Sequence, residues 1–353
     1  MNLSGTKYQS QIEHDSLVLA KWYEANQRKL PWRESKNPYF IWISEVMLQQ
    51  TTVAAVMPYF ERFISRFPTL ESLADAPIED VLEMWSGLGY YSRARNLHKS
   101  AKGLRLGPFP TTYQKLIEFP GLGPYTARAV TSIAFGDRAG VVDGNVIRVL
   151  SRRWGLAIEW WKNKEKDKLQ KIADDLVQHA DPSMVNQGLM ELGATVCSKE
   201  KPICGLCPWR KNCLAFKTGE TANLPLKKPK KEKSLWLYNA EIIQNRSQIL
   251  FTKNSSLPVL SRMWMIPGKI ERINKKPKNY DFTHSVTDHI IYVVSKKPRT
   301  SMLSDARPDK SPSKKSNTLS KADETDLKWI ALHEIGKFSQ SSLTKKLLKK
   351  WDL

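Results

Sequence analysis

The sequence predicts a mainly α-helical N-terminal region joined by a basic linker to a smaller α+β domain. Three observations carry this prediction. Apolar residues recur at helical spacing through much of residues 1–220, a proline-punctuated lysine run covers residues 227–233, and short β-branched and aromatic runs follow it. With 353 residues, 41% of them hydrophobic, the chain can form two or three domains with cores of their own.

The net charge of +21 is unevenly placed along the chain. Residues 221–353 carry 27 lysines and arginines against 12 acidic residues. Such an excess favours a polyanionic partner, of which nucleic acid is the natural candidate. No apolar run approaches the ~18 residues needed to span a bilayer, and residues 9–15 are polar rather than signal-like. We therefore expect a cytoplasmic protein with access to DNA and no membrane partner.

Two helices are expected before residue 60, one around residues 17–23 and one over residues 41–52. In the second, Ser44 can cap the helix and Glu45 lies among apolar neighbours. Because burial disfavours the charged form of a carboxyl, we expect a raised pKa for Glu45, which suits a general acid near neutral pH. The alternative is a first-turn glutamate stabilised by the helix dipole.

Residues 118–127 predict a helix, a tight hairpin and a second helix, because Pro120 and two glycines interrupt the helical pattern. Gly121 and Gly123 carry no side chains, so a phosphate can approach the backbone N–H groups at the next helix start. Asp143 precedes another apolar helical run, where it is either an N-cap or a functional carboxylate. An ordinary glycine turn between two helices is the alternative for the hairpin.

This hairpin, followed by V-V-D-G-N-V-x-R-V-L, resembles the helix-hairpin-helix superfamily of DNA glycosylases, in which the aspartate is catalytic. L-P-W-R at residues 30–33, S-E-V-M-L-Q-Q-T at 44–51 and G-L-G-Y-Y-S-R at 87–93 resemble the MutY-type adenine-DNA glycosylases. The matches keep the family order from about residue 17 to residue 216.

The resemblance assigns Glu45 as the general acid, Asp143 as the second catalytic carboxylate and Tyr125 as the residue beside the scissile sugar. Cleavage through an oxocarbenium-like sugar needs one protonated and one ionised carboxyl, and a helix N-terminus favours an ionised Asp143. Electrostatic and covalent roles for Asp143 both stay open. Bifunctional relatives resembling endonuclease III have a lysine at the Tyr125 position, whose amine forms a Schiff base. A phenol cannot do this, so we expect a monofunctional enzyme.

The resemblance also implies a set of DNA-binding residues. Positions matching the adenine pocket include Gln187, whose amide can pair bidentately with adenine. Base chemistry on a duplex requires the base to leave the stack, and wedged side chains lower that cost. The pocket candidates are Arg28, Trp32, Leu48 and Gln187; the wedge candidates are Gln50, Leu88 and Tyr90; Asn145 completes the motif around Asp143. Loop packing of Leu88 and Tyr90, and a satisfied surface amide at Gln187, are the alternatives.

All four cysteines lie within seventeen residues, as Cys197, Cys204, Cys207 and Cys213. Four thiolates suit a [4Fe–4S] cluster or tetrahedral zinc. The spacing matches the family's cluster loop at every cysteine, so the resemblance implies a [4Fe–4S] cluster. Basic residues around it favour a loop held against phosphate, with a solvated charged rim as the alternative.

The resemblance implies four parts, one of which is made of two separate ranges. Residues 1–29 and 138–220 form a helical iron–sulfur cluster domain, residues 30–137 a helix-hairpin-helix domain, residues 221–234 a basic linker, and residues 235–353 a Nudix-like mismatch-recognition domain. In the last we expect strands near residues 236–243, 249–251 and 290–294, and a closing helix over 341–351. Residues 304–326 are expected to form a loop.

Phe282, Thr283 and His284 match the family's F-[ST]-H loop, which recognises 8-oxoguanine opposite the adenine. The alternative is an aromatic residue packed in the domain's own core beside a surface histidine. Met265 stands where the family has glutamate, which leaves the local detail of this region open.

The expected function is therefore a monomeric, cytoplasmic DNA repair glycosylase of bacterial type, associated with the nucleoid. It would hydrolyse the N-glycosidic bond of adenine mispaired with 8-oxoguanine or guanine in double-stranded DNA. A glycosylase/lyase for oxidised pyrimidines is disfavoured by Tyr125 and by the C-terminal domain. A non-catalytic DNA-binding protein would not need Glu45 and Asp143 together.

Overall fold

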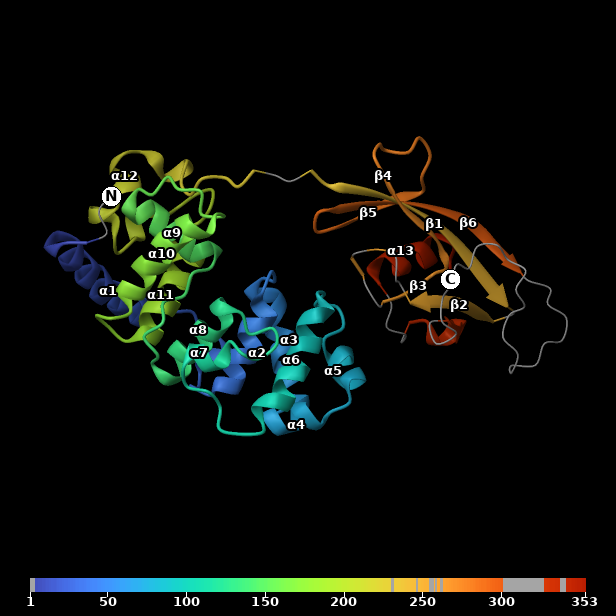
Figure 1. The fold of residues 1–353 in the computed structure, drawn as a ribbon, viewed down its shortest axis with the longest axis horizontal. Coiled ribbons are helices and arrows are strands. Elements are labelled where there is room, and N and C mark those ends of the chain that lie inside the picture. The colour runs from blue at the N-terminus through green and yellow to red at the C-terminus, as the bar shows by residue number, and fades with distance from the viewer. Residues whose placement is uncertain are drawn as a thin grey trace. The chain divides into compact units, whose positions relative to one another are not determined.

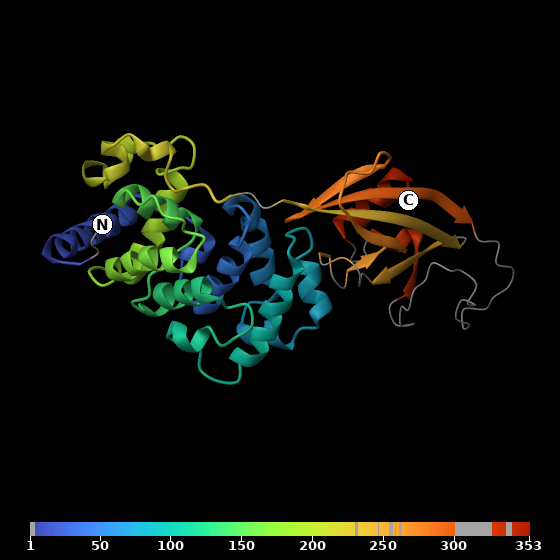
Figure 2. The ribbon, with the colours of Figure 1, turned by 45° about the horizontal axis from the view of Figure 1, so that its top comes forward.

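The computed structural model describes residues 4–229, 232–245, 247–253, 257, 259–260, 263–300, 327–336 and 341–353. The chain divides into two compact units, Met1–Lys228 and Pro229–Leu353. The first unit is built from helices and the second from a sheet with a helix, as the ribbon shows from two sides (Figures 1 and 2). The predicted fold class is confirmed.

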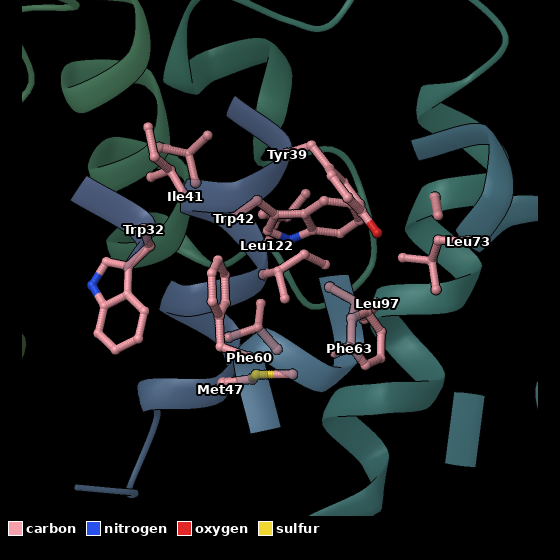
Figure 3. Packing of buried hydrophobic residues seen from close by; sticks show 14 of the residues in the cluster. Trp32, Tyr39, Ile41, Trp42, Met47, Phe60, Phe63, Leu73, Leu97 and Leu122 are labelled. Carbon is pink, nitrogen blue, oxygen red and sulfur yellow. The ribbon is translucent and has the colours of Figure 1, made fainter. Parts of the chain in front are cut away.

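The first core of unit 1 lies among helices α2 to α8. They are α2 (Pro38–Leu48), α3 (Val53–Arg66), α4 (Leu70–Asp75), α5 (Ile78–Met84), α6 (Tyr91–Leu104), α7 (Tyr113–Leu116) and α8 (Pro124–Phe135), preceded by the short helix η1 (Pro31–Arg33). Trp42 of α2, Phe63 of α3 and Leu97 of α6 point into this core (Figure 3). Burying such large apolar side chains stabilises the helices, each contributing roughly 1.5–3 kcal/mol.

Helix α2 begins earlier than the sequence predicts. Its N-cap is Asn37, whose side chain accepts a hydrogen bond from the Tyr39 N–H, and Pro38 follows at the first helical position. Ser44 is therefore an interior residue whose hydroxyl donates to the Ile41 carbonyl, and its expected capping role is wrong. The shift places Glu45 in the last half of the helix, away from the favourable end of the helix dipole.

The second core of unit 1 lies among α1 (Thr6–Asn26), α9 (Gly144–Trp154), α10 (Asn163–Leu176) and α11 (Pro182–Thr195). The cysteine segment packs beside it through η2 (Cys204–Leu206), η3 (Arg210–Asn212) and α12 (Leu214–Lys217). A buried ion pair between Asp15 and Arg153 joins α1 to α9, with 2.8 Å between Oδ2 and Nε. The Trp209 indole N–H donates to the Asp15 carbonyl, so α1 also holds the cysteine segment.

The start of the predicted linker is anchored to unit 1. Residues 220–222 form the short helix η4 (Glu220–Ala222), and Leu224 is buried. The Leu224 carbonyl accepts from Arg152 and the Leu226 carbonyl accepts from the Trp160 indole. The first residues of the expected linker are therefore held on unit 1, because Arg152 and Trp160 donate hydrogen bonds to their backbone. The boundary between the units falls at Lys228–Pro229.

Unit 2 contains one mixed sheet and a closing helix. The strands are β1 (Ser234–Asn245), β2 (Gln248–Lys253), β3 (Trp264–Met265), β4 (Gly268–Ile273), β5 (Phe282–Val286), β6 (His289–Thr300) and β7 (Leu327–Ala331), with the helix α13 (Ser342–Lys350). The order is β3-β2-β1-β6-β5, while β4 pairs with β1 and β7 with β2. Strands β1 and β6 run parallel, and the other pairs are antiparallel. This confirms the expected α+β, Nudix-like architecture.

The predicted recognition loop of unit 2 is a strand in the structure. Residues 282–284, expected in a loop, lie in β5, where Phe282, Thr283 and His284 pair with Val293, Tyr292 and Ile291 of β6. The segment carries β-forming residues and pairs with β6, so it extends the sheet.

Residues 304–326 lie outside the described residues. Within the described part of the chain, no helix is long and apolar enough to cross a bilayer.

Candidate active site

The centre of the candidate site is Glu45, which is 6% exposed although it carries a carboxyl group. The Tyr125 hydroxyl, at the start of α8, donates to Glu45 Oε2 across 2.9 Å. Burial is the largest influence and raises the pKa of Glu45 to about 7, as expected from its apolar neighbours in the sequence. Burial also keeps the pKa of the Tyr125 phenol well above its usual value, so the phenol stays neutral.

Asp143 is the second carboxyl of the site. It is the N-cap of α9, and its Oδ1 accepts from the Val146 N–H across 2.7 Å. Asn145 donates to Asp143 Oδ2 across 3.1 Å. Burial nevertheless raises the pKa of Asp143 from its usual value, although these hydrogen bonds act in the opposite direction. Asp143 also acts electrostatically on Glu45 and helps to raise the pKa of Glu45, which places the two carboxyls in one site.

A hydrogen-bonded chain leads from Asp143 toward the cysteine segment. Asn145 Oδ1 accepts from Arg148 Nη2 across 2.7 Å, and Arg148 Nε donates to the Cys197 carbonyl across 2.8 Å. Asn145 fits tightly against α11, because a Cβ on Gly193 would lie 2.6 Å from the Asn145 Cβ. The position of Asn145 is therefore fixed by its packing as well as by its hydrogen bonds.

Arg28 lies in a cluster with Arg33 and Glu191 that the sequence did not predict. Glu191 of α11 is 0% exposed and accepts from both guanidinium groups. The positive charge of Arg33 acts on Glu45 and lowers the pKa of Glu45, opposing the effect of burial. Arg28 is thus held by the buried Glu191 carboxylate, which also binds Arg33.

The other expected pocket residues lie on the elements that carry Glu45 and Glu191. Leu48 is one turn after Glu45 on α2 and is half-buried. Trp32 in η1 is buried, its ring meeting the Phe60 ring edge-on at 5.3 Å between centroids (Figure 3). Gln187 is half-buried one turn before Glu191, and its amide donates to the Ser183 hydroxyl.

Met190 is a site residue that sequence reasoning missed. Its Sδ lies 3.3 Å from the Tyr125 hydroxyl, and it is half-buried on α11. Met190, Gln187 and Glu191 share one side of α11 because they are three to four residues apart. The helical spacing from Gln187 was a signal that could have found the other two.

The wedge candidates divide into exposed and buried residues. Gln50 and Tyr90 are exposed and have left-handed backbone angles, φ 59° and φ 48°, which are costly for residues other than glycine. Both line a cavity of about 270 Å³ together with Arg93 and Gly121. Leu88, by contrast, is 8% exposed within the first core. Its predicted insertion into DNA would require it to leave that core.

The hairpin residues Gly121 and Gly123 have different reasons to be glycine. Gly121 has φ +78°, and a Cβ there would lie 2.7 Å from the Asn96 Cβ. Gly123 is the N-cap of α8 without a side-chain cap, and a Cβ there would meet nothing within 4 Å. The N-terminal end of α8 therefore has no side-chain cap, and there is open space where a side chain at Gly123 would lie.

The four thiols are partly buried free cysteines. Burial is the main cause that raises the pKa of the Cys207 thiol to about 12, and the other three cysteines add to it electrostatically. Arg152 Nη1 lies 3.5 Å from Cys197 Sγ, and the Cys213 thiol donates to the Arg152 carbonyl. Among the described residues, no group of three or more histidine, cysteine or acidic side chains is gathered tightly enough for one metal ion.

In unit 2, alternate residues of β5 face opposite sides of the sheet. Phe282 and His284 face α13: Phe282 is half-buried against the core, and buried His284 lies 3.5 Å from the Ser342 hydroxyl. Thr283 is exposed on the other face. Phe282 also lines an open cavity of about 520 Å³ with Lys346 and Lys349.

Comparisons with known proteins identify the family. The HhH-GPD superfamily of base excision DNA repair proteins matches residues 43–179. An adenine DNA glycosylase of Buchnera aphidicola from Schizaphis graminum is 37% identical over 282 residues, covering 76% of this chain and 80% of the relative. This chain belongs to the adenine DNA glycosylase family. The adenine DNA glycosylase of Homo sapiens is 42% identical over 218 residues, which are 58% of this chain and 40% of the relative.

Membership of the family confirms the predicted enzyme class, a DNA glycosylase of base excision repair. A solved structure of a thermostable thymine-DNA glycosylase has a TM-score of 0.53 and 27% identity, covering 59% of this chain and 98% of that chain. Glycosylases named for different bases thus share this helical fold. The fold alone does not select the base, so the substrate must be argued from the site residues.

Proposed function

We propose that this enzyme removes adenine from double-stranded DNA in which the adenine is mispaired with 8-oxoguanine or guanine. The observation that carries the proposal is the buried Glu45 carboxyl, hydrogen-bonded to Tyr125 and near Asp143. A carboxyl with a pKa near 7 is protonated in a useful fraction of molecules at neutral pH and can donate that proton.

In this mechanism Glu45 protonates N7 of the flipped adenine, which makes the base a better leaving group. The sugar develops positive charge as the glycosidic bond breaks. Asp143 either stabilises that charge electrostatically or traps the sugar covalently, and water then adds to C1′ of the sugar and loses a proton, which leaves an abasic site and free adenine. Its N-cap hydrogen bonds from Val146 and Asn145 favour the ionised form, while burial favours the neutral form. Charge developing on the sugar would add to the stabilisation of the ionised form.

The half-buried and buried residues beside Glu45 form the proposed adenine pocket. Trp32 and Leu48 supply its apolar walls, and the Gln187 amide pairs with the adenine edge after exchanging its bond to Ser183. Arg28 completes the wall. Gln50 and Tyr90 fill the gap left in the base stack, with Leu88 behind them.

The hairpin before α8 is the proposed grip on the DNA backbone. Gly123 provides no side-chain cap for α8 and leaves open space where a side chain would lie, and the helix dipole favours a phosphate at this end of the helix. On unit 2, Phe282, Thr283 and His284 are proposed to recognise 8-oxoguanine. Thr283 is on the exposed face, whereas Phe282 and His284 pack toward α13 and would need to turn outward.

The enzyme is proposed to be monofunctional, because Tyr125 supplies a neutral phenol where a lyase needs an amine. The four cysteines are proposed to hold a [4Fe–4S] cluster. Burial disfavours the thiolate form of a cysteine, and a bound metal cation restores it. Four partly buried cysteines close in sequence therefore fit a metal cluster as its ligands. Ligands of a four-iron cluster are spread more widely than ligands of one ion. The cluster, when bound, would fix the loop that carries Lys199, Lys201, Arg210 and Lys211 rather than take part in base removal.

Replacing Cys204 with alanine tests the cluster proposal. We expect the purified variant to lose visible brown absorbance and to bind DNA with a changed salt dependence, because the loop loses the metal that positions its basic residues. Ser198→Ala, beside a cysteine in the same loop, is the matched control and should stay coloured. A colourless wild-type protein with one zinc per chain would overturn the proposal.

The function itself is tested with duplexes that carry A:8-oxoguanine, A:G, T:G or thymine glycol, each incubated with the enzyme and analysed with and without alkali. We expect the two adenine duplexes to be cut at the adenine, and only after alkali. Cutting of thymine glycol without alkali would indicate a glycosylase/lyase. Cutting of T:G would indicate a thymine-specific enzyme, and binding without base loss would indicate a non-catalytic protein.

A further inference from the structure

We propose that Glu191 is a positioning residue of the active site. It holds Arg28 and Arg33 in place, and its negative charge reduces the net positive charge that acts on Glu45. This inference rests on the proposed role of Glu45 as the general acid. Glu191 does not touch Glu45 or the expected position of the sugar in any described contact, so it would act through the two arginines.

The geometry shows one carboxylate serving two cations. Glu191 Oε1 accepts from Arg28 Nε across 2.6 Å and from the Arg28 backbone N–H across 3.2 Å. Glu191 Oε2 accepts from Arg28 Nη2 across 3.0 Å and from Arg33 Nη2 across 2.9 Å. The arginines lower the pKa of Glu191 although burial opposes this, so Glu191 is ionised.

The cluster joins two segments that are far apart in the chain. Arg28 and Arg33 flank the turn into η1, and the Arg28 carbonyl accepts from Arg33 Nη1 across 3.1 Å. Glu191 comes from α11, more than 150 residues later. A fully buried charged group is costly unless it is paired. One arginine would be enough to pair the Glu191 carboxylate. The second arginine gives the cluster a net positive charge, and the charge of Arg33 acts on Glu45.

The charges that face Glu45 are balanced between opposing effects. Tyr125 comes from α8, Asp143 from the start of α9 and Arg33 from η1. Asp143 raises the pKa of Glu45, and Arg33 lowers it. Without the negative charge of Glu191, two uncompensated arginines would favour the ionised form of Glu45. The proton needed for catalysis would then be lost at a lower pH.

Glu191→Gln removes the charge and keeps the shape, and the amide oxygen still accepts from an arginine. We expect the pH at which the single-turnover rate of adenine release falls to move downward by ~0.5–1 unit, a 3- to 10-fold change in proton affinity. Glu191→Asp keeps the charge and should leave this pH close to that of the wild type. Arg33→Met removes the cation that acts on Glu45 and should move it upward.

Asp15→Asn is the matched control, because Asp15 is also fully buried and paired with an arginine, but in the second core. It should lower the melting temperature without moving the pH profile. A Glu191→Gln variant that is slower by the same factor at every pH, or whose profile moves upward, would overturn the proposal. Arg33→Met gives an independent answer if Glu191→Gln does not fold.

A second readout separates this inference from the proposed function. The Glu45 carboxyl can be titrated by ¹³C NMR, with its signal identified by its loss in Glu45→Gln. If the wild type releases no adenine, the proposed function fails, while a downward shift of the Glu45 titration in Glu191→Gln would still support the positioning role. An unchanged titration in an active enzyme would overturn the positioning role alone.

Discussion

In unit 1, the groups that act on the buried Glu45 carboxyl of α2 come from η1, α8 and the start of α9. In unit 2, the predicted recognition residues Phe282, Thr283 and His284 are neighbours on a single strand. Because several elements pack around Glu45, its carboxyl is desolvated and acted on by charges of opposite sign. Neighbours in sequence alone cannot produce this environment. A strand instead divides neighbouring side chains between two faces.

A short motif predicts a site reliably only when its side chains can reach the same ligand. When the residues of a motif pack against distant segments, burial and neighbouring charges can give them the reactivity that the motif predicts. The raised pKa of Glu45 is an example. A three-residue motif on a strand cannot present all three side chains to one ligand unless the strand rearranges. His284 also lies against α13, and burial lowers its pKa, so it favours the neutral form.

The largest expected effect tests the unit 1 side of the comparison. Glu45→Gln should slow adenine release by at least ~10²–10⁴-fold, because it removes the acid and keeps the shape. Mismatch binding, measured by gel shift, should stay near that of the wild type. Glu61→Gln, exposed on α3, is the control. A single-turnover rate within a few-fold of the wild type would refute the assignment of Glu45.

A smaller effect is expected when the two α13-facing residues of β5 are changed. Replacing Phe282 and His284 together with alanine should slow A:8-oxoguanine processing more than A:G processing, by an amount on the order of the ~1–3 kcal/mol of a good base contact. Leu343→Ala, buried on α13, controls for a weakened core. Equal loss on both duplexes in the double variant, matching Leu343→Ala, would make these residues structural.

The smallest effect is expected at the exposed position between them. Thr283→Ala should reduce the preference for A:8-oxoguanine over A:G by the roughly 0.5–1.5 kcal/mol of one hydrogen bond. The melting temperature should not change, because Thr283 is exposed. Ser285→Ala, exposed two residues further on the same face, is the matched control. An effect of Ser285→Ala equal to that of Thr283→Ala would assign the loss to the strand face as a whole.

Much of the fold followed from local pattern. Helical periodicity and Pro-Gly punctuation located the hairpin before α8, and β-forming runs located β1, β2 and β6. The family motifs named the two carboxyls. Local pattern failed where a neighbour in space decided the outcome: Asn37 rather than Ser44 caps α2, and β6 draws residues 282–284 into the sheet.

The amino-acid sequence specifies which chemical groups this protein has and at which spacing they recur. Helix and strand patterns are set within a few residues of one another, and motif spacing is a property of the chain alone. Three features depend on the folded chain: Glu191 accepts hydrogen bonds from two arginines, Gln50 and Tyr90 take left-handed backbone angles, and Leu88 is buried. The reason is that desolvation and ion pairing depend on groups brought together from distant segments, and these set the protonation of Glu45.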